Sequence, residues 1–153
     1  MSNDIAIKVQ HITKTFGPIV ANNDVDMDVR KGEILAVLGE NGSGKTTLMN
    51  MLVGIYYPDS GQIFVDGKEG VIASPKDAFA CGIGMIHQHF KLVDVFTATE
   101  NIVLGIKGKY DLKQAKKRIV EMSSKYGFNI DPDKKVYGMS VSEKQTVEIV
   151  KAL

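Results

Sequence analysis

The sequence has 153 residues, of which 44% are hydrophobic and 24% charged, and its formal net charge is +1. This composition is typical of one modest globular domain, and the nearly neutral charge gives no electrostatic support for nucleic-acid binding. We expect no signal peptide and no membrane span, so that any work at a membrane would be peripheral. The single cysteine, Cys81, lies in the apolar stretch AFACGIGMI, which predicts a buried structural thiol in a reducing compartment.

The first third of the chain has the pattern of strands followed by a helix. Apolar and polar residues alternate over residues 5–10 and 25–30, as in half-buried strands. Residues 34–38, ILAVL, are continuously apolar, which predicts a strand buried on both faces of a parallel sheet. Residues 45–53 then form an apolar stripe at helical spacing, and Gly54 is a plausible C-cap.

The middle of the chain predicts a hairpin, a short helix and another strand. Residues 57–68 have a turn, a short strand and a second turn at Asp66. Ser74 as N-cap and Pro75 at the first helical position predict the start of a helix. Residues 83–90 predict a strand that leads into a loop.

The last third is predicted to be helical. Residues 97–105 predict a short helix, residues 111–126 an amphipathic helix ended by Gly127, and residues 140–153 a further helix. The apolar stripe of the amphipathic helix consists of Leu112, Ala115, Ile119, Met122 and Tyr126. Its basic residues, interpreted as a solvated face rather than a nucleic-acid patch, are Lys113, Lys116, Lys117 and Arg118.

The stretch GENGSGKTT, residues 39–47, matches the pattern G-x-x-x-x-G-K-[ST] between a predicted strand and a predicted helix. Glycines allow successive backbone N–H groups to turn toward a phosphate, and the helix N-terminus adds favourable dipole charge. We expect Lys45 to contact the β- and γ-phosphates and the Thr46 hydroxyl to bind Mg²⁺. By itself the motif does not separate transport ATPases from GTPases, kinases or repair enzymes. The loop residues expected to bind nucleotide are Gly39, Asn41, Gly42, Ser43, Gly44, Lys45, Thr46 and Thr47.

Over essentially the whole chain the sequence resembles the nucleotide-binding domain of ABC transporters. The most specific stretch is GENGSGKTTLMNMLVGIYYPDSGQIFVDGK, residues 39–68. The resemblance implies an α/β fold of the P-loop NTPase, ABC type, that is incomplete. It places an N-terminal antiparallel β subdomain and the phosphate-loop core, a strand followed by a helix, in residues 1–90, and a helical subdomain in residues 91–153. The segment ITKTFG resembles the part of the family that carries an adenine-stacking aromatic residue, which would be Phe16; alternatively, Phe16 packs on the N-terminal sheet.

The segment GIGMIHQHF resembles the strand and loop that carry the family's glutamine, here Gln88. The resemblance implies that Gln88 acts in catalysis by binding Mg²⁺ or orienting water, and that its loop faces the transmembrane partner. The alternative is a polar loop residue without a ligand. His87 and His89 flank Gln88, but no third ligand is near in the sequence, so we expect no metal site there.

Residues 139–143, MSVSE, align with the family's signature, usually LSGGQ, in which only Ser140 matches. The resemblance implies that Ser140 contacts the γ-phosphate of ATP held by an opposite domain, although the side chains at Val141 and Ser142 would hinder a close backbone approach. Alternatively, Ser140 and Glu143 form a helix capping box. Both interpretations remain open at this level.

The family supplies its Mg²⁺-organising acid and its catalytic base on a later strand, and we expect the chain to end just before that strand. Asp66 in IFVDG is interpreted as a turn residue rather than this acid. The chain is therefore expected to be a fragment that binds ATP without hydrolysing it and that self-associates through open sheet edges. Light scattering that shows a clean monomer with cooperative melting would count against the self-association.

The segments HQHF and TATENIVLG most resemble the ATPases of nucleoside and simple-sugar importers, and HQHF resembles the nucleoside importers more than the sugar importers. The resemblance implies ATP and Mg²⁺ as ligands, and transmembrane permease subunits, a second ABC domain and, indirectly, a solute-binding protein as partners. It also implies a peripheral location on the cytoplasmic face of the cell membrane. Two alternatives are a non-catalytic nucleotide-binding module and an ABC-type ATPase that works in repair or translation without a transporter.

Overall fold

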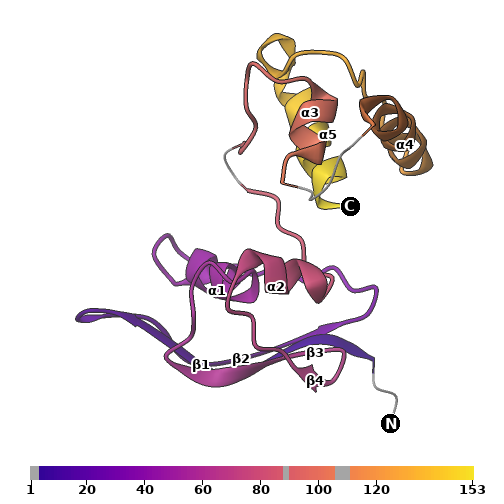
Figure 1. Cartoon of the computed structure of the whole chain (residues 1–153). Helices are drawn as coiled ribbons and strands as arrows, with labels where there is room; N and C mark the ends of the chain where they lie inside the picture. Colours follow the sequence, from indigo (N-terminus) through magenta and orange to yellow (C-terminus); the bar gives the residue numbers. More distant parts are fainter. Residues whose placement is uncertain (1–3, 88–89, 106–110) are drawn as a thin grey trace. The chain divides into compact units, whose positions relative to one another are not determined.

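The computed structural model describes residues 4–87, 90–105 and 111–153, and the chain divides into two compact units, 1–84 and 85–153 (Figure 1). The first unit contains an antiparallel sheet with the strand order β2-β1-β3-β4. Its long strands β1 (Ile5–Phe16) and β2 (Ile19–Arg30) form a hairpin. The short strands β3 (Ser60–Val65) and β4 (Lys68–Glu69) follow on the other side of β1.

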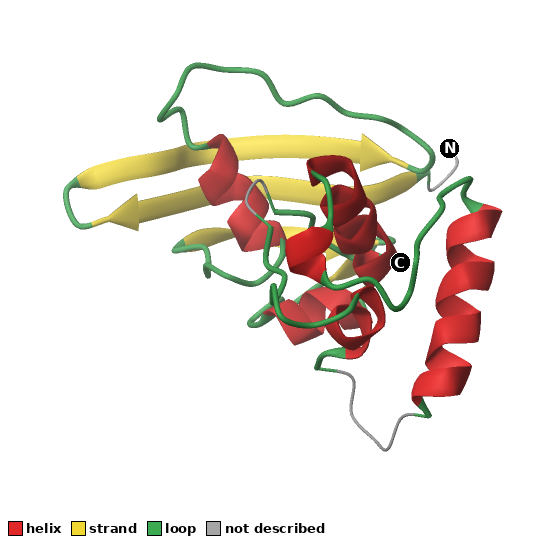
Figure 2. Cartoon of the chain, turned by 90° about the horizontal axis from the view of Figure 1, so that it is seen from above, coloured by secondary structure: helices red, strands yellow, loops and turns green. Residues whose placement is uncertain are grey.

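Two short helices, α1 (Lys45–Leu52) and α2 (Pro75–Ala80), lie on the same side of this sheet (Figures 1 and 2). The apolar stripe of α1 is buried, as the spacing of its residues predicts. Gly54 follows α1 with φ 71°, and a Cβ on it would lie 2.4 Å from the carbonyl carbon of Ser74. Only glycine therefore allows the exit of α1 to pack this closely on the start of α2. The buried core of this unit includes Val9, Ile12, Leu48, Met51, Leu52 and Ile63.

Most local predictions for this unit are confirmed. The two alternating stretches lie in β1 and β2, and the turn at Asp66 joins β3 to β4 with φ 49° at this residue. The Ser74 hydroxyl accepts a hydrogen bond from the Asp77 N–H as the N-cap of α2, and Pro75 occupies its first position. These features depend on neighbours within a few residues, which is why the sequence predicts them well.

The predicted core strand at residues 34–38 is wrong for this structure. The segment is not a strand, and all its residues are exposed, Ile34 by 98%. A buried parallel strand needs a neighbour on each side to pair its backbone and cover its side chains. In the described part of the chain, the sheet is the antiparallel one above, and residues 34–38 pair with none of its strands. The strand predicted at residues 83–90 is also not formed over its described part, for the same reason.

The prediction of a buried thiol is also wrong, because Cys81 is free and exposed. The residue is the C-cap of α2, where the helix turns away at Gly82 with φ 77°. Its neighbour Phe79 is exposed too, so the apolar stretch around Cys81 does not mark the core of this unit. Apolar neighbours in sequence do not guarantee burial, because burial depends on packing against other elements.

The second unit is helical within its described residues. It consists of α3 (Ala98–Val103), α4 (Leu112–Lys125), a 3₁₀ turn η1 (Val136–Gly138) and α5 (Val141–Ala152). The three predicted helices are thus confirmed. Their core contains Ala98, Ile119, Ile130, Val147 and Val150, with Leu92, Ile102, Phe128 and Met139 packed around it.

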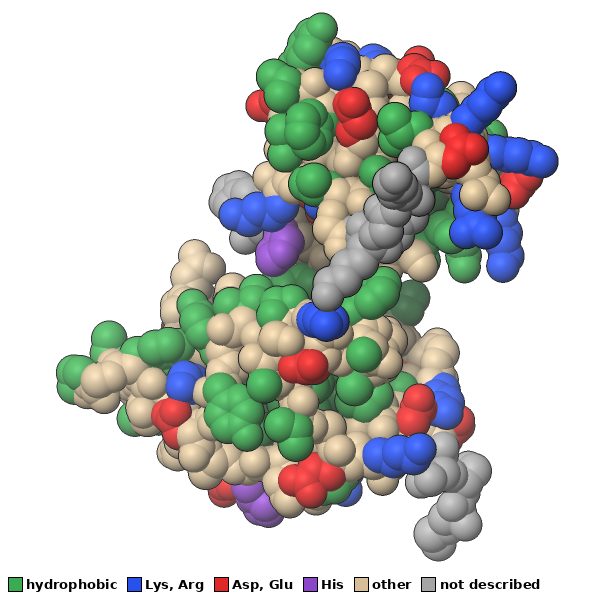
Figure 3. All heavy atoms as spheres, viewed as in Figure 1, with side chains coloured by type: hydrophobic (Ala, Val, Ile, Leu, Met, Phe, Trp, Pro, Cys, Tyr) green, Lys and Arg blue, Asp and Glu red, His purple; other side chains and the backbone are tan. Residues whose placement is uncertain are grey.

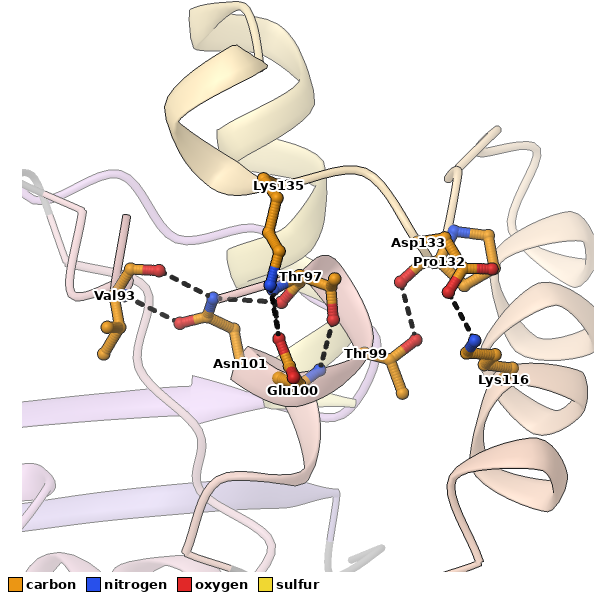
Figure 4. Close-up of polar contacts among 9 residues, drawn as sticks. All are labelled: Val93, Thr97, Thr99, Glu100, Asn101, Lys116, Pro132, Asp133 and Lys135. Carbon is orange, nitrogen blue, oxygen red and sulfur yellow. Dashed lines mark hydrogen bonds and ion pairs between the residues drawn. The ribbon is translucent and has the colours of Figure 1, made fainter. Parts of the chain in front are cut away.

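A polar network fixes the start of α3 (Figure 4). The buried Asn101 side chain accepts from the Val93 N–H at 2.7 Å and donates to the Val93 and Thr97 carbonyls at 3.1 and 3.0 Å. Thr97 and Glu100 form a capping box, and Glu100 pairs with Lys135. A buried amide is tolerated only when its hydrogen bonds are made, as they are here.

Helix α4 buries fewer residues than its predicted apolar stripe contains. Ile119 and Ser123, four residues apart, are buried, whereas Leu112, Met122 and Tyr126 are exposed. The Ser123 hydroxyl donates to the Val120 carbonyl at 3.0 Å, which satisfies it inside the core. Only the centre of the predicted stripe therefore packs.

The surface of the described residues carries many large hydrophobic side chains, which Figure 3 shows on both units.

No helix among the described residues is long and apolar enough to cross a membrane.

Candidate functional site

The loop of residues 39–47 joins the exposed segment before it to α1, and its glycines set its shape. Gly42 and Gly44 have φ 87° and 82°, a region that other residues rarely adopt, and Gly44 is the N-cap of α1. A Cβ on Gly44 would lie 2.1 Å from the Ala21 carbonyl oxygen of β2. The loop therefore approaches the sheet so closely that this position accepts only glycine.

The Lys45 ammonium folds back into this loop. Its Nζ donates to the carbonyl oxygens of Gly39 and Glu40 at 2.8 and 2.7 Å and to the Ser43 hydroxyl at 3.3 Å. The Ser43 N–H also donates to the Glu40 carbonyl at 3.2 Å, which tightens the turn. The single positive charge of the loop thus lies among its own carbonyl groups.

The start of α1 offers hydrogen-bond donors next to this charge. The Leu48 N–H donates to the Gly44 carbonyl at 2.9 Å as the first bond of the helix. The N–H groups of Lys45, Thr46 and Thr47 precede that bond, at positions where a helix has no internal acceptor. No acidic residue lies in the first turn, so the positive end of the helix dipole is not neutralised there. A lysine together with first-turn N–H groups is the combination of donors that anion sites at helix N-termini use.

Asn22 of β2 lies under this helix start and was missed by the sequence analysis. It is 93% buried, with an exposed fraction of 7%, and its Nδ2 donates to the Gly44 carbonyl at 3.4 Å. Its Oδ1 is buried without a hydrogen-bond partner. Asn22 is a polar residue out of phase with the alternation of Val25, Met27 and Val29 in β2, and one sequence alone gives no sign that it meets a loop 22 residues away.

Phe16 is the last residue of β1 and lies at the tip of the long hairpin. The residue is 42% exposed, so part of its surface is not covered by the sheet. The Tyr56 ring lies 5.2 Å away at an interplanar angle of 72°, and the Lys14 Nζ lies 5.5 Å from the Phe16 ring centroid. Phe16 thus keeps open ring surface beside two neighbours in the same unit.

Ser140 lies in the second unit and is engaged as the cap of α5. Its N–H donates to the Glu143 carboxylate at 2.7 Å, and its hydroxyl accepts from the Glu143 N–H at 3.3 Å. The capping-box interpretation of the sequence is therefore confirmed. Lys134 donates to Glu143 at 2.6 Å, and this bond together with the Ser140 bonds lowers the pKa of Glu143 to about 2.

Gln88 and His89 lie outside the described residues. Asp66 lies in the hairpin turn and pairs with Lys31 at 2.9 Å, which raises the pKa of Lys31. Within the described ranges, no three His, Cys, Asp or Glu side chains come together as metal ligands would.

Comparison with known proteins shows the family to which the chain belongs. The family model described as "ABC transporter" matches residues 22–153. The chain therefore belongs to the ABC transporter family, and its fold is an incomplete ABC-type ATP-binding domain.

The chain is 51% identical to the nucleoside import ATP-binding protein NupA of Lactococcus lactis subsp. cremoris, over all of this chain and 31% of that protein. It is 47% identical to the guanosine import ATP-binding protein NupO of Bacillus subtilis, over 98% of this chain and 30% of that protein. The chain thus spans about a third of the length of these relatives. The chain is also similar to a solved structure, the ADP conformation of an ATP-binding cassette of an ABC transporter, with a TM-score of 0.80 and 25% sequence identity. The match covers 97% of this chain and 64% of that one.

Proposed function

We propose that these 153 residues form the nucleotide-binding part of an ABC importer ATPase. The observation that carries the proposal is the loop of residues 39–47, in which the Lys45 ammonium folds back onto the Gly39 and Glu40 carbonyls and Gly44, the N-cap of α1, packs on β2. In this proposal the triphosphate of ATP replaces the Gly39 and Glu40 carbonyls as the partner of Lys45. The bonds from Lys45 to phosphate join two opposite charges and are therefore stronger than its bonds to neutral carbonyls.

The Thr46 hydroxyl fits a Mg²⁺ ion bound with the nucleotide. It is exposed in the first turn of α1, next to the position where the phosphates would lie, and hydroxyl oxygen is an acceptable ligand for this hard cation. Mg²⁺ would neutralise phosphate charge there. Asn41, Gly42, Ser43 and Thr47 would add hydrogen bonds to the phosphates, and Gln88 would complete the Mg²⁺ and water contacts.

The open ring surface of Phe16 would stack on the adenine base. A second ABC domain would approach the same nucleotide with its residue equivalent to Ser140, as the family resemblance implies. Because the Ser140 hydroxyl already caps α5 and the positions after it are Val141 and Ser142, this contact would be made by backbone groups at best. This observation favours weak turnover at the site that the signature serves, and it keeps a non-catalytic binding role as the second candidate.

The parent protein would hydrolyse ATP to drive uptake through membrane permeases on the cytoplasmic face. Nucleosides are the solute class we propose, because the names of NupA and NupO refer to nucleoside and guanosine import. These residues alone would bind without hydrolysis, because Asp66 is held in a turn by Lys31 and does not supply the acid that hydrolysis needs.

The test is a titration of the chain with Mg-ATP by calorimetry, with Lys45→Ala as the variant and Lys68→Ala, an exposed lysine of β4, as the control. Hydrogen bonds to charged groups contribute roughly 1.5–3 kcal/mol, so Lys45→Ala should weaken binding at least about tenfold. The Lys68→Ala chain should bind like the wild type. Equal affinities of all three proteins, or a wild type that does not bind, would contradict the proposal.

A further inference from the structure

A carboxylate from the segment after α1 is tied to the end of β1 at three points. The Asp59 oxygens accept from the Thr15 N–H, the Thr15 hydroxyl and the Lys14 Nζ, each at 2.7 Å. The Asp59 N–H in turn donates to the Thr13 carbonyl at 2.9 Å. Asp59 therefore fixes the three residues that directly precede Phe16.

The same segment also contacts Phe16 itself. Tyr56, three residues before Asp59, places its ring edge to face with Phe16, at a centroid distance of 5.2 Å. Lys14, which Asp59 holds, keeps its ammonium 5.5 Å from the Phe16 ring centroid. Phe16 thus has neighbours whose positions both depend on the segment of residues 56–59.

The hairpin gives Phe16 little other support. Phe16 pairs with Ile19 across the turn at Gly17, which has φ 57°, and Ile19 and Val20 are exposed. The tip of a two-stranded ribbon is only marginally stable without packing. The direction of the Phe16 ring is therefore set by its contacts with Tyr56 and with Lys14, which Asp59 holds, rather than by the core.

Asp59 is charged whenever the protein is at neutral pH. The bonds from Lys14 and Thr15 lower the pKa of Asp59 to about 2. Both of its oxygens are in use, so the isosteric Asp59→Asn variant would lose the ion pair with Lys14 and one of its acceptors. This substitution removes the clamp with a minimal change of shape.

We infer that Asp59 is a positioning residue for base recognition, which holds Phe16 with its open face toward the aromatic base of a bound nucleotide. The inference rests on the proposed function, in which Phe16 stacks on the base. It adds that the base and phosphate parts of the site are supported separately. Asp59 and Tyr56 support Phe16, whereas Gly44 and Asn22 support the phosphate loop.

The experiment compares two probes that differ only by the nucleoside: Mg-ATP and Mg-tripolyphosphate. Their dissociation constants are measured for the wild type, Asp59→Asn, Phe16→Ala and the control Asp66→Asn, which changes an exposed turn acid of the same unit. Stacking of a base on an aromatic residue is worth on the order of tenfold in affinity or more, so Phe16→Ala should weaken ATP by about that factor. Asp59→Asn should weaken ATP by about threefold to tenfold, since it misplaces the ring without removing it. Tripolyphosphate affinity should stay within about twofold in all four proteins.

Amide hydrogen exchange of the nucleotide-free chain adds a direct readout of the clamp. The Thr15 N–H should exchange faster in Asp59→Asn than in the wild type, while the amides of α1 should not change. Unchanged Thr15 exchange, or an equal loss of ATP and tripolyphosphate affinity in Asp59→Asn, would overturn the inference.

The Phe16→Ala variant separates this inference from the proposed function. A wild type that binds neither probe, or a Phe16→Ala chain that binds ATP as well as the wild type, contradicts base stacking and the inference with it. A loss in Phe16→Ala with wild-type behaviour of Asp59→Asn contradicts the inference alone.

Discussion

Substituting Gly44 by alanine should destabilise the first unit much more than the same substitution at Gly42. Both glycines have left-handed backbone conformations, φ 82° and 87°, so alanine is strained at either position. That strain costs about 1–2 kcal/mol for an L-residue. A Cβ on Gly42 would meet nothing within 4 Å, whereas on Gly44 it would lie 2.1 Å from the Ala21 oxygen and 2.9 Å from the Asn22 Nδ2.

The Ala21 oxygen belongs to the backbone of β2, so it cannot move aside like the end of a flexible side chain. Forcing α1 and β2 apart adds an overpacking cost of about 1–3 kcal/mol. The totals are then about 1–2 kcal/mol for Gly42→Ala and about 2–5 kcal/mol for Gly44→Ala. For a unit of this size, 1 kcal/mol shifts the melting temperature by roughly 4–8 °C.

The assay is urea unfolding followed by circular dichroism, with melting curves of the same three proteins. The two variants share backbone strain and differ in the contact with β2, so their difference isolates the close approach of the loop to the sheet. Equal losses of stability in both variants would refute the reasoning. They would show that α1 does not pack on β2 at Gly44 in solution.

Two titratable contacts and a helix cap give further predictions. The hydrogen bond of His11 to Asp24, together with the nearby charge of Asp26, raises the pKa of His11 above 6.5. The stability that this contact adds is therefore fully present below pH 6.5, and it is lost as the pH rises through the higher pKa of His11 in the folded protein. The His11→Gln variant should not show this pH dependence of the melting temperature. Ser140→Ala should destabilise α5 by about 1 kcal/mol in urea unfolding, and an unchanged midpoint would contradict the cap. The stability that Glu143 contributes is present above its unfolded pKa of 4.5 and should be lost as the pH falls toward about 2. An acid titration that follows helicity should show this loss in the wild type and not in Glu143→Gln.

Features of the fold with local causes could be predicted from the sequence. Ser74 caps α2 through the backbone of Asp77, three residues on, and Ser140 caps α5 through Glu143 in the same way. The turn at Asp66 also depends only on its neighbours. In each case the residues that decide the structure are adjacent in the chain, and their side-chain chemistry has few alternatives.

Features that depend on distant partners could not be predicted. The apolar pattern of residues 34–38 predicts a strand, but these residues form none, because strand formation needs neighbours that the described part of the chain does not provide. Cys81 was assigned to the core from its apolar neighbours and lies exposed. Asp59 was interpreted as part of a turn, yet its carboxylate binds Thr15, which lies 44 residues earlier in the sequence.

The candidate site shows the same contrast between local and distant causes. The motif at residues 39–47 predicts which side chains bind nucleotide, whereas the structure shows which contacts hold these residues in place. Gly44 and Leu48 are fixed against the sheet and core by close packing, while residues 34–40 are exposed. The two halves of the loop therefore have different support, and Lys45 links them by donating to the Gly39 and Glu40 carbonyls.

A nucleotide that engages Lys45 would compete with this link. The helix side of the loop would keep its shape, because its contacts with β2 do not involve the lysine. The side of Gly39 and Glu40 would instead exchange its bonds to Lys45 for contacts with phosphate. Since breaking two charge-assisted bonds offsets part of the gain from new ones, the affinity for phosphate would depend on how well the segment before the loop is ordered by other means.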